Sequence, residues 1–182
     1  AIVAQTTELG TTRHLIRSVA RNTGDALDIL GQIISFRIPV MAATFVVVNA
    51  ACLLVRPSLA DTLLLVSLYL LLQDLQFSYS AFFVGLERYR IRAAVDLTAQ
   101  VLLAGLTLLL AEGGGLHALL WAYVGAHASV LLVTTWLIAT RHGRIHLHWD
   151  LGAARRLAQQ SFPSFAVITL DTLHFKFDTL ML

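Results

Sequence analysis

Four long apolar segments constrain this chain more than any other feature of its sequence. They cover residues 33–55, 59–84, 93–111 and 116–140. Each is long enough, as a helix rising about 1.5 Å per residue, to cross most or all of the roughly 30 Å of hydrocarbon in a bilayer. A backbone in hydrocarbon must satisfy its own hydrogen bonds, and a helix does so within one segment. We therefore predict an all-α, polytopic transmembrane helix bundle.

The composition agrees with a membrane as the solvent. Apolar residues make up 57% of the 182, only 13% are charged, and the mean hydropathy is +0.74, which one soluble core could hardly hide. A fifth apolar segment occupies residues 162–182, and residues 1–9 resemble the tail of an earlier helix. Because the opening AIVAQTTELG has neither an initiating Met nor a signal peptide, we expect the chain to be a piece of a longer protein.

Arginines are concentrated in alternate loops, which predicts the orientation. Ten basic residues lie on one side of the predicted membrane against one, Arg56, on the other. By the positive-inside rule, the arginine-rich side faces the cytoplasm, so we expect a multi-pass protein of the inner (cytoplasmic) membrane. Since topology explains the arginines and no nucleic-acid module accompanies them, we expect no nucleic-acid partner. The ten residues are Arg13, Arg17, Arg21, Arg88, Arg90, Arg92, Arg141, Arg144, Arg155 and Arg156.

Three histidines, His142, His146 and His148, lie close together in one of these loops. A metal site would need their rings to converge, and we favour a solvated cytoplasmic segment that leads into a short amphipathic helix at residues 151–160. We therefore expect no metal. The lone Cys52 is expected to be a small buried hydrophobe, and nothing in the sequence calls for a cofactor.

Polar and small residues recur at helical spacing inside the predicted membrane segments. One face of the 59–84 helix and its end carries such residues, which should face protein rather than lipid. In the 116–140 helix, small residues predict close helix packing, and His127 beside them is expected to be a hydrogen-bonded structural histidine. The residues of the first face are Ser67, Asp74, Ser78, Ala81 and Gly85, flanked by Gln73, Gln76 and Ser80; the small residues of the second are Ala118, Ala122, Gly125, Ala126 and Ser129.

The final segment carries four ionisable residues, Asp171, His174, Lys176 and Asp178. Its large apolar residues favour insertion by roughly 0.5 kcal/mol each, whereas each charge opposes it by up to about 3 kcal/mol. The segment is therefore tolerable only where protein or water receives the charges. Lys176 either lines a hydrated pathway or forms a structural pair, while Asp171, His174 and Asp178 form either an ion-coupling set or a structural polar stripe.

Two charges lie within or beside the other helices. Arg37, two residues before Pro39, either faces a cavity that opens to the cytoplasm or extends its side chain to the membrane surface. Asp96 stands four residues after Arg92, where a local ion pair suffices, so we do not expect Asp96 to be a site.

Three stretches of the chain resemble one family. "ELGTTRHLIRSVAR", "GLERYRIRAAVDLTAQ" and "FPSFAVITLDTLHFKFDTLML" are similar to the polysaccharide-exporter flippases. These are the O-antigen and lipid-linked oligosaccharide translocases of the multidrug/oligosaccharidyl-lipid/polysaccharide exporter superfamily. The resemblance covers essentially the whole chain, from the end of the family's second helix into its seventh, so most of the second lobe would lie beyond it.

The resemblance implies a two-lobe transporter that works by alternating access and is not an enzyme. Its cargo would be a polyprenyl-pyrophosphate-linked glycan, such as a lipopolysaccharide precursor, and its other partners would be membrane lipids and proteins of envelope-glycan assembly. The implied substrate-pathway residues are Arg37, Asp74, Lys176 and Asp178. By position, Arg37 and Lys176 are the candidates for the cations that receive the pyrophosphate. Asp171 and His174 are the candidates for ion coupling.

Two other classes fit the same sequence features. A drug or metabolite exporter of the same superfamily would share the lobe, because the architecture does not identify the cargo. A membrane-embedded glycosyltransferase or polymerase would also be rich in leucine and have arginine-rich loops, but it would need a catalytic carboxylate or a nucleotide-sugar motif, and we find neither in the sequence.

Overall fold

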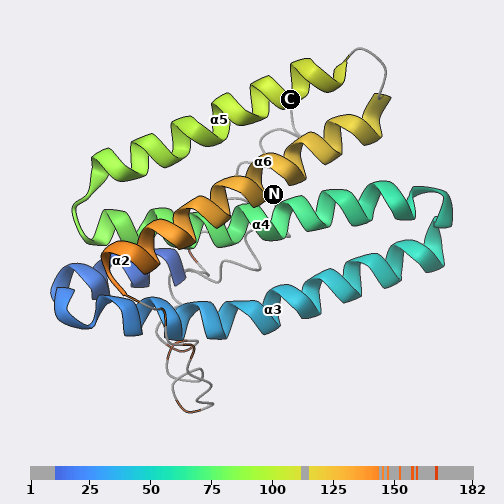
Figure 1. Ribbon diagram of the computed structural model, residues 1–182. Coiled ribbons are helices and arrows are strands. Elements are labelled where there is room, and N and C mark those ends of the chain that lie inside the picture. The colour runs from blue at the N-terminus through green and yellow to red at the C-terminus, as the bar shows by residue number, and fades with distance from the viewer. Residues whose placement is uncertain are drawn as a thin grey trace, which may run out of the picture.

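The computed structural model describes residues 11–111 and 115–143, together with the single positions 145, 147, 152, 157, 159 and 167. Within these residues the chain is all-α, as predicted, and short 3₁₀ turns η1 and η2 flank the long helix α3 (Figure 1). The elements are α2 (Thr11–Arg21), η1 (Thr23–Asp25), α3 (Ala26–Val55), η2 (Pro57–Leu59), α4 (Ala60–Gly85), α5 (Tyr89–Ala111) and α6 (Gly115–Arg141).

Four of the helices, α3 to α6, are long and apolar enough to cross a membrane. Their outer surfaces carry large apolar side chains that stay exposed, which a helix tolerates when lipid surrounds it. The chain is thus a multi-pass membrane protein in its described part. The most exposed of these residues include Leu54, Val55, Leu108, Leu109, Leu132 and Trp136.

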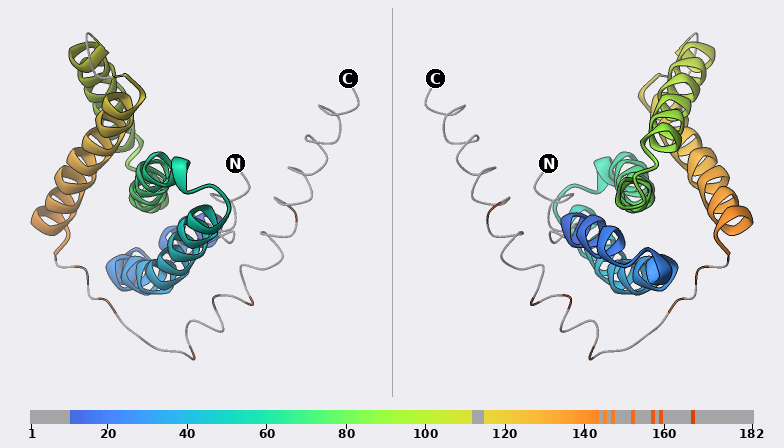
Figure 2. Two further views of the ribbon diagram at one scale, coloured as in Figure 1. Left: turned by 90° about the vertical axis from the view of Figure 1, so that its right-hand side faces the viewer. Right: turned by 90° about the vertical axis from the view of Figure 1, so that its left-hand side faces the viewer.

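Helix α4 is the centre of the bundle. The end-on views in Figure 2 show α4 between α3 on one side and the α5–α6 pair on the other. It packs against α2, α3, α5 and α6, and the α5–α6 pair also has an extensive contact of its own. The chain therefore forms successive hairpins, α3–α4 and α5–α6, that meet along α4 (Figure 1).

The structure adds a helix that the apolar segments did not predict. Helix α2 has only 11 residues, about 16 Å, which is too short to span a bilayer. It buries Thr11, Leu15 and Val19, spaced four residues apart, and leaves the arginines between them exposed. The same packing extends α3 upstream: the predicted start at residue 33 is corrected to Ala26, because Ala26 and Leu30 are buried in the bundle.

A hydrophobic core fills the arginine-rich end of the bundle. Side chains from α2, α3, α4 and α6 meet there, and several of them are fully buried. Gly85, the last residue of α4, lies in this core. A glycine fits there because α2 leaves no room for a side chain: a Cβ atom would lie 2.8 Å from Val19 Cβ. The principal core residues are Leu15, Val19, Leu30, Ile33, Phe82, Phe83 and Ile138.

The turn after α4 has a left-handed residue that is not glycine. Glu87 has φ of 58°, a conformation that favours glycine over residues with a Cβ. The N–H of Arg88 donates to Phe83 O at 2.8 Å and that of Glu87 to Val84 O at 2.9 Å, which is the Schellman pattern of helix ends. This closure directs the chain from α4 straight into α5.

We predict that Gly85→Ala destabilises the protein by about 1–3 kcal/mol, because the added methyl group would overlap Val19. Gly105→Ala is the matched control, since a Cβ atom at Gly105 meets nothing within 4 Å. The measurement is the free energy of unfolding of the full-length protein in detergent. Equal stability of the two variants would contradict the close contact between α2 and α4.

Candidate functional site

The polar residues of α4 contact three different neighbouring helices. Toward α3, Ser67 Oγ accepts a hydrogen bond from the side-chain amide of Asn49 at 2.9 Å. Toward α6, Gln76 Oε1 lies 2.7 Å from His127 Nδ1, and toward α5, Ser80 Oγ donates to Asp96 Oδ1 at 3.1 Å. The predicted protein-facing stripe on α4 is confirmed, because Ser67, Asp74, Ser78, Ala81 and Gly85 are all buried.

Two of the predicted pathway residues meet in this bundle. Arg37 on α3 forms an ion pair with Asp74 on α4 through its Nη2 atom and Asp74 Oδ1. Its Nη1 atom donates a hydrogen bond of 2.7 Å to Ser78 Oγ, one turn further along α4. The Arg37 side chain is fully buried. We call Arg37, Asp74 and Ser78 the arginine cluster.

Depth in the membrane makes the ion pair in this cluster important. Arg37 and Asp74 each lie eleven residues, about 17 Å, from the arginine-rich end of their helix, and both fall within the candidate membrane spans. An isolated charge there is expensive, so intramembrane arginine and aspartate residues generally pair with each other. In this structure the Arg37 side chain is fully buried against α4 and bonded to Asp74 and Ser78, so it does not extend outward toward the membrane surface.

A proline lies beside the cluster on α3. Pro39 has no N–H to donate, so the carbonyl of Ser35, one turn earlier, lacks its usual helical partner. In a membrane helix such a position is a local weak point where the helix can bend. Arg37 lies between Ser35 and Pro39, so bending there would change the position of the guanidinium relative to Asp74.

The histidine in the middle of α6 is part of a separate polar contact. His127 is 8% exposed, and its Nδ1 atom is hydrogen-bonded to Gln76 Oε1. Because an amide oxygen only accepts, this bond requires the proton on Nδ1. The ring also contacts Tyr69, with centroids 5.2 Å apart, and Tyr69 in turn contacts Tyr123. This arrangement agrees with the structural role predicted for His127.

Of the other ionisable residues discussed from the sequence, the structure describes Asp96 but not the four in the final segment. Asp96 forms an ion pair with Arg92, with Nε and Oδ2 3.4 Å apart, which confirms the predicted local pair. Asp96 also accepts a hydrogen bond from Ser80 on α4. Residue spacing along α5 alone could not predict this contact between two helices. The remaining candidates, Asp171, His174, Lys176 and Asp178, lie outside the described residues.

Sequence reasoning missed one member of the polar contacts, Asn49, and the partner of another, Ser78. Asn49 was passed over within the 33–55 segment, although a lone amide among valines and alanines is itself a signal of a partner on another helix. Ser78 was placed on the protein-facing stripe, but nothing in the sequence indicated that Arg37 would be its donor. Both depend on which helices become neighbours.

One of the three loop histidines lies in the described part of the chain. The ring of His142 contacts Phe82 with centroids 5.8 Å apart, so the ring packs on the bundle. Burial, followed by the charges of Arg88 and Arg141, lowers the pKa of His142 below its ordinary value. His146 and His148 lie outside the described residues, so their relation to His142 stays a prediction.

The arginine cluster offers one clear chemical capability. A guanidinium presents a planar set of N–H donors that matches carboxylate and phosphate oxygens equally well. In this structure a carboxylate occupies that donor set, and the low dielectric of the bundle strengthens the attraction. An anion able to replace Asp74 would meet a desolvated cation.

The site and the four spanning helices define a polytopic helical membrane protein with a charged pair inside its bundle. No protein-family model, curated protein or solved structure matches the chain.

We predict that Arg37→Met and Asp74→Leu, made singly, each destabilise the full-length protein by about 3–5 kcal/mol, because each leaves the opposite charge buried without this partner. The double variant should recover much of the loss. The measurement is a double-mutant cycle on the free energy of unfolding in detergent. Additive losses in the double variant would contradict a coupled pair.

We also predict a pH effect at His142. Since its pKa is lowered in the folded protein, the unfolded chain takes up the proton first, and stability falls as the pH drops below about 6.5. His142→Gln should make the melting temperature less dependent on pH between 7.5 and 5. NMR of labelled histidine measures the pKa of the His142 ring directly. A pKa above that of a free histidine would contradict the lowered pKa.

Proposed function

We propose that this chain belongs to a membrane transporter that moves lipid-linked oligosaccharide or polysaccharide precursors from the cytoplasmic to the outer leaflet. The observation that carries the proposal is a fully buried arginine, Arg37, held by Asp74 and Ser78 within a candidate membrane span. Ionisable residues inside membrane spans commonly mark substrate or ion pathways, and a buried ion pair is by itself weak evidence for a stabilising role. The resemblance of the chain to polysaccharide-exporter flippases supplies the cargo.

In the proposed mechanism, the pyrophosphate of the carrier lipid exchanges with Asp74 as the partner of Arg37. The described conformation is then a resting state in which the carboxylate neutralises the guanidinium. Two phosphate groups offer more acceptor oxygens than one carboxylate, so the cargo gains charge-assisted hydrogen bonds that Asp74 gives up. Protonation of the released Asp74 would stabilise it in the bundle and would link the cycle to a proton gradient.

The weak point at Pro39 gives this exchange a physical route. Bending of α3 there would separate the guanidinium from α4 and open a passage between the two helices. The hydrophobic core at the arginine-rich end, which joins α2, α3, α4 and α6, would stay packed and serve as the fixed part. Alternating access would then be a change in the α3–α4 contact about that core.

A flipping assay tests this proposal with the full-length protein in proteoliposomes that contain a fluorescent polyprenyl-pyrophosphate glycan. The wild type should expose the glycan on the opposite leaflet. The Arg37→Met/Asp74→Leu double variant keeps a neutral, packed α3–α4 contact, so it should fold and yet lose transport by about tenfold or more, the effect of at least one charge-assisted hydrogen bond.

Arg13→Met is the control, since Arg13 lies exposed on α2 on the same side of the bundle. Transport by the double variant at the wild-type rate would make the pair purely structural and would contradict the mechanism. Export of soluble amphipathic cations without any glycan flipping would instead identify a drug or metabolite exporter.

A further inference from the structure

A second feature lies on the outer side of the bundle, between α5 and α6. Residues from both helices line a groove of about 360 Å³. Val95, Val130 and Thr134 are buried at its floor, whereas Leu102 and Val133 on its rim remain exposed. The groove is thus open to the surroundings of the bundle, and it is separate from the arginine cluster between α3 and α4.

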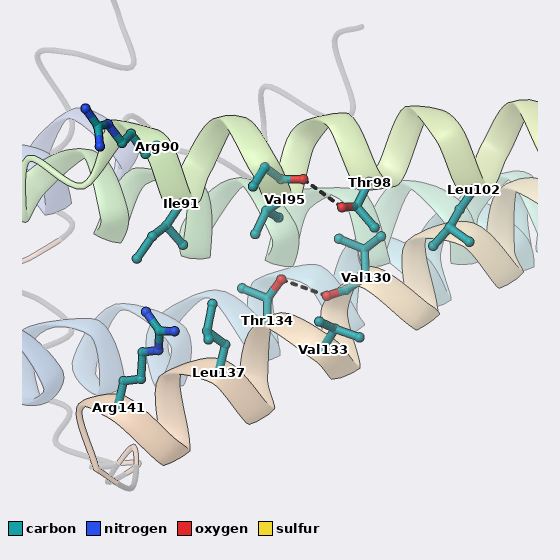
Figure 3. Close-up of a pocket in the computed structure, with 11 residues that line it drawn as sticks. Arg90, Ile91, Val95, Thr98, Leu102, Val130, Val133, Thr134, Leu137 and Arg141 are labelled. Carbon is teal, nitrogen blue, oxygen red and sulfur yellow. Dashed lines mark hydrogen bonds between the residues drawn. The ribbon is translucent and has the colours of Figure 1, made fainter.

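Two threonines line the middle of the groove, but their hydroxyl groups are not free to donate to a ligand. Thr98 Oγ1 donates to Ala94 O at 2.7 Å, and Thr134 Oγ1 donates to Val130 O at 2.7 Å, as the dashed lines in Figure 3 show. Each hydroxyl proton is therefore used within its own helix. The groove offers methyl and methylene groups, a surface that suits a hydrocarbon chain.

One end of the groove is positively charged. Arg90 at the start of α5 and Arg141 at the end of α6 both lie there, with Leu102 at the opposite end (Figure 3). Both arginines are exposed, and within the described residues neither forms an ion pair. Two guanidinium groups at the rim of an apolar groove are complementary to a phosphate attached to a hydrocarbon chain.

The length of the groove matches one leaflet of a bilayer. From Arg90 to Leu102 the α5 helix rises about 18 Å, slightly more than half of the roughly 30 Å of hydrocarbon. The charged end lies at the arginine-rich side, where phosphate headgroups of that leaflet would be. A single lipid molecule would therefore have its headgroup at Arg90 and Arg141 and its chain along Ile91, Thr98 and Leu102.

We propose that the α5–α6 groove is a binding site for an anionic glycerophospholipid of the arginine-side leaflet. The two arginines hold the phosphate, and the apolar floor of Val95 and Val130 receives one acyl chain. The lipid would join α5 to α6 at the end where the helices open apart, and so stabilise the outer hairpin of the bundle. This site is independent of the transport proposed for the arginine cluster, because it needs neither Arg37 nor Asp74.

Native mass spectrometry of the full-length protein tests the site. Delipidated protein in detergent is mixed with phosphatidylglycerol or phosphatidylcholine, and the bound lipid is counted. We expect phosphatidylglycerol to be retained about tenfold more tightly, and Arg90→Ala/Arg141→Ala to remove that preference. The control is Arg13→Ala/Arg21→Ala, which removes equal charge from exposed positions of α2.

A second pair of variants tests the acyl-chain part of the groove without changing charge. Ala94→Phe fills the groove and should reduce retention of both lipids, whereas Ala93→Phe, exposed on the same helix outside the groove, should not. Equal retention of the two lipids by the wild type would overturn the proposal. So would equal effects of the two arginine pairs or of the two phenylalanine variants, or a structure of the whole protein with another helix in the groove.

Discussion

The pairing of Arg37 with Asp74 is the interaction on which the arrangement of the described helices depends most. A charge placed in a membrane bundle must meet an opposite charge or water, and this requirement is stricter than any preference for apolar packing. Because Ser78 joins the pair one turn along α4, the guanidinium fixes both the height and the rotation of α4 relative to α3. A rotation by one residue, about 100°, would turn Asp74 away from Arg37.

The same logic extends around α4. Ser67, Gln76 and Ser80 contact side chains on α3, α6 and α5, so polar contacts join the central helix to three of its four neighbours. Apolar packing alone would distinguish poorly among these neighbours, since lipid tails are as apolar as leucine and valine side chains. The hydrophobic core contributes specificity mainly at the arginine-rich end, where α2 packs against Gly85. The bundle is therefore firmly packed at one end and joined by polar contacts further along, which is a reasonable basis for a protein that changes shape.

Two groups of arginines have different surroundings and, in our proposals, different ligands. Arg37 is buried and already paired, so an anion reaches it only when the contact between α3 and α4 changes. Arg90 and Arg141 are exposed at the rim of a groove that is already open. A lipid in that groove would be a permanent part of the structure, whereas a phosphate at Arg37 would be a transient cargo.

The sequence by itself determined the solvent, the helical class and the approximate positions of the four spanning helices, because a bilayer requires long apolar segments and helical backbone bonding. It also determined the buried face of α4, since helical spacing assigns residues to a face. It did not reveal α2, which is short and amphipathic, nor the partners of Arg37, Gln76 and Asn49. Those partners come from helices 18 to 51 residues away along the chain. Only the tertiary structure decides them, because periodicity defines one helix at a time, whereas a contact between helices depends on how each is placed and rotated against the next.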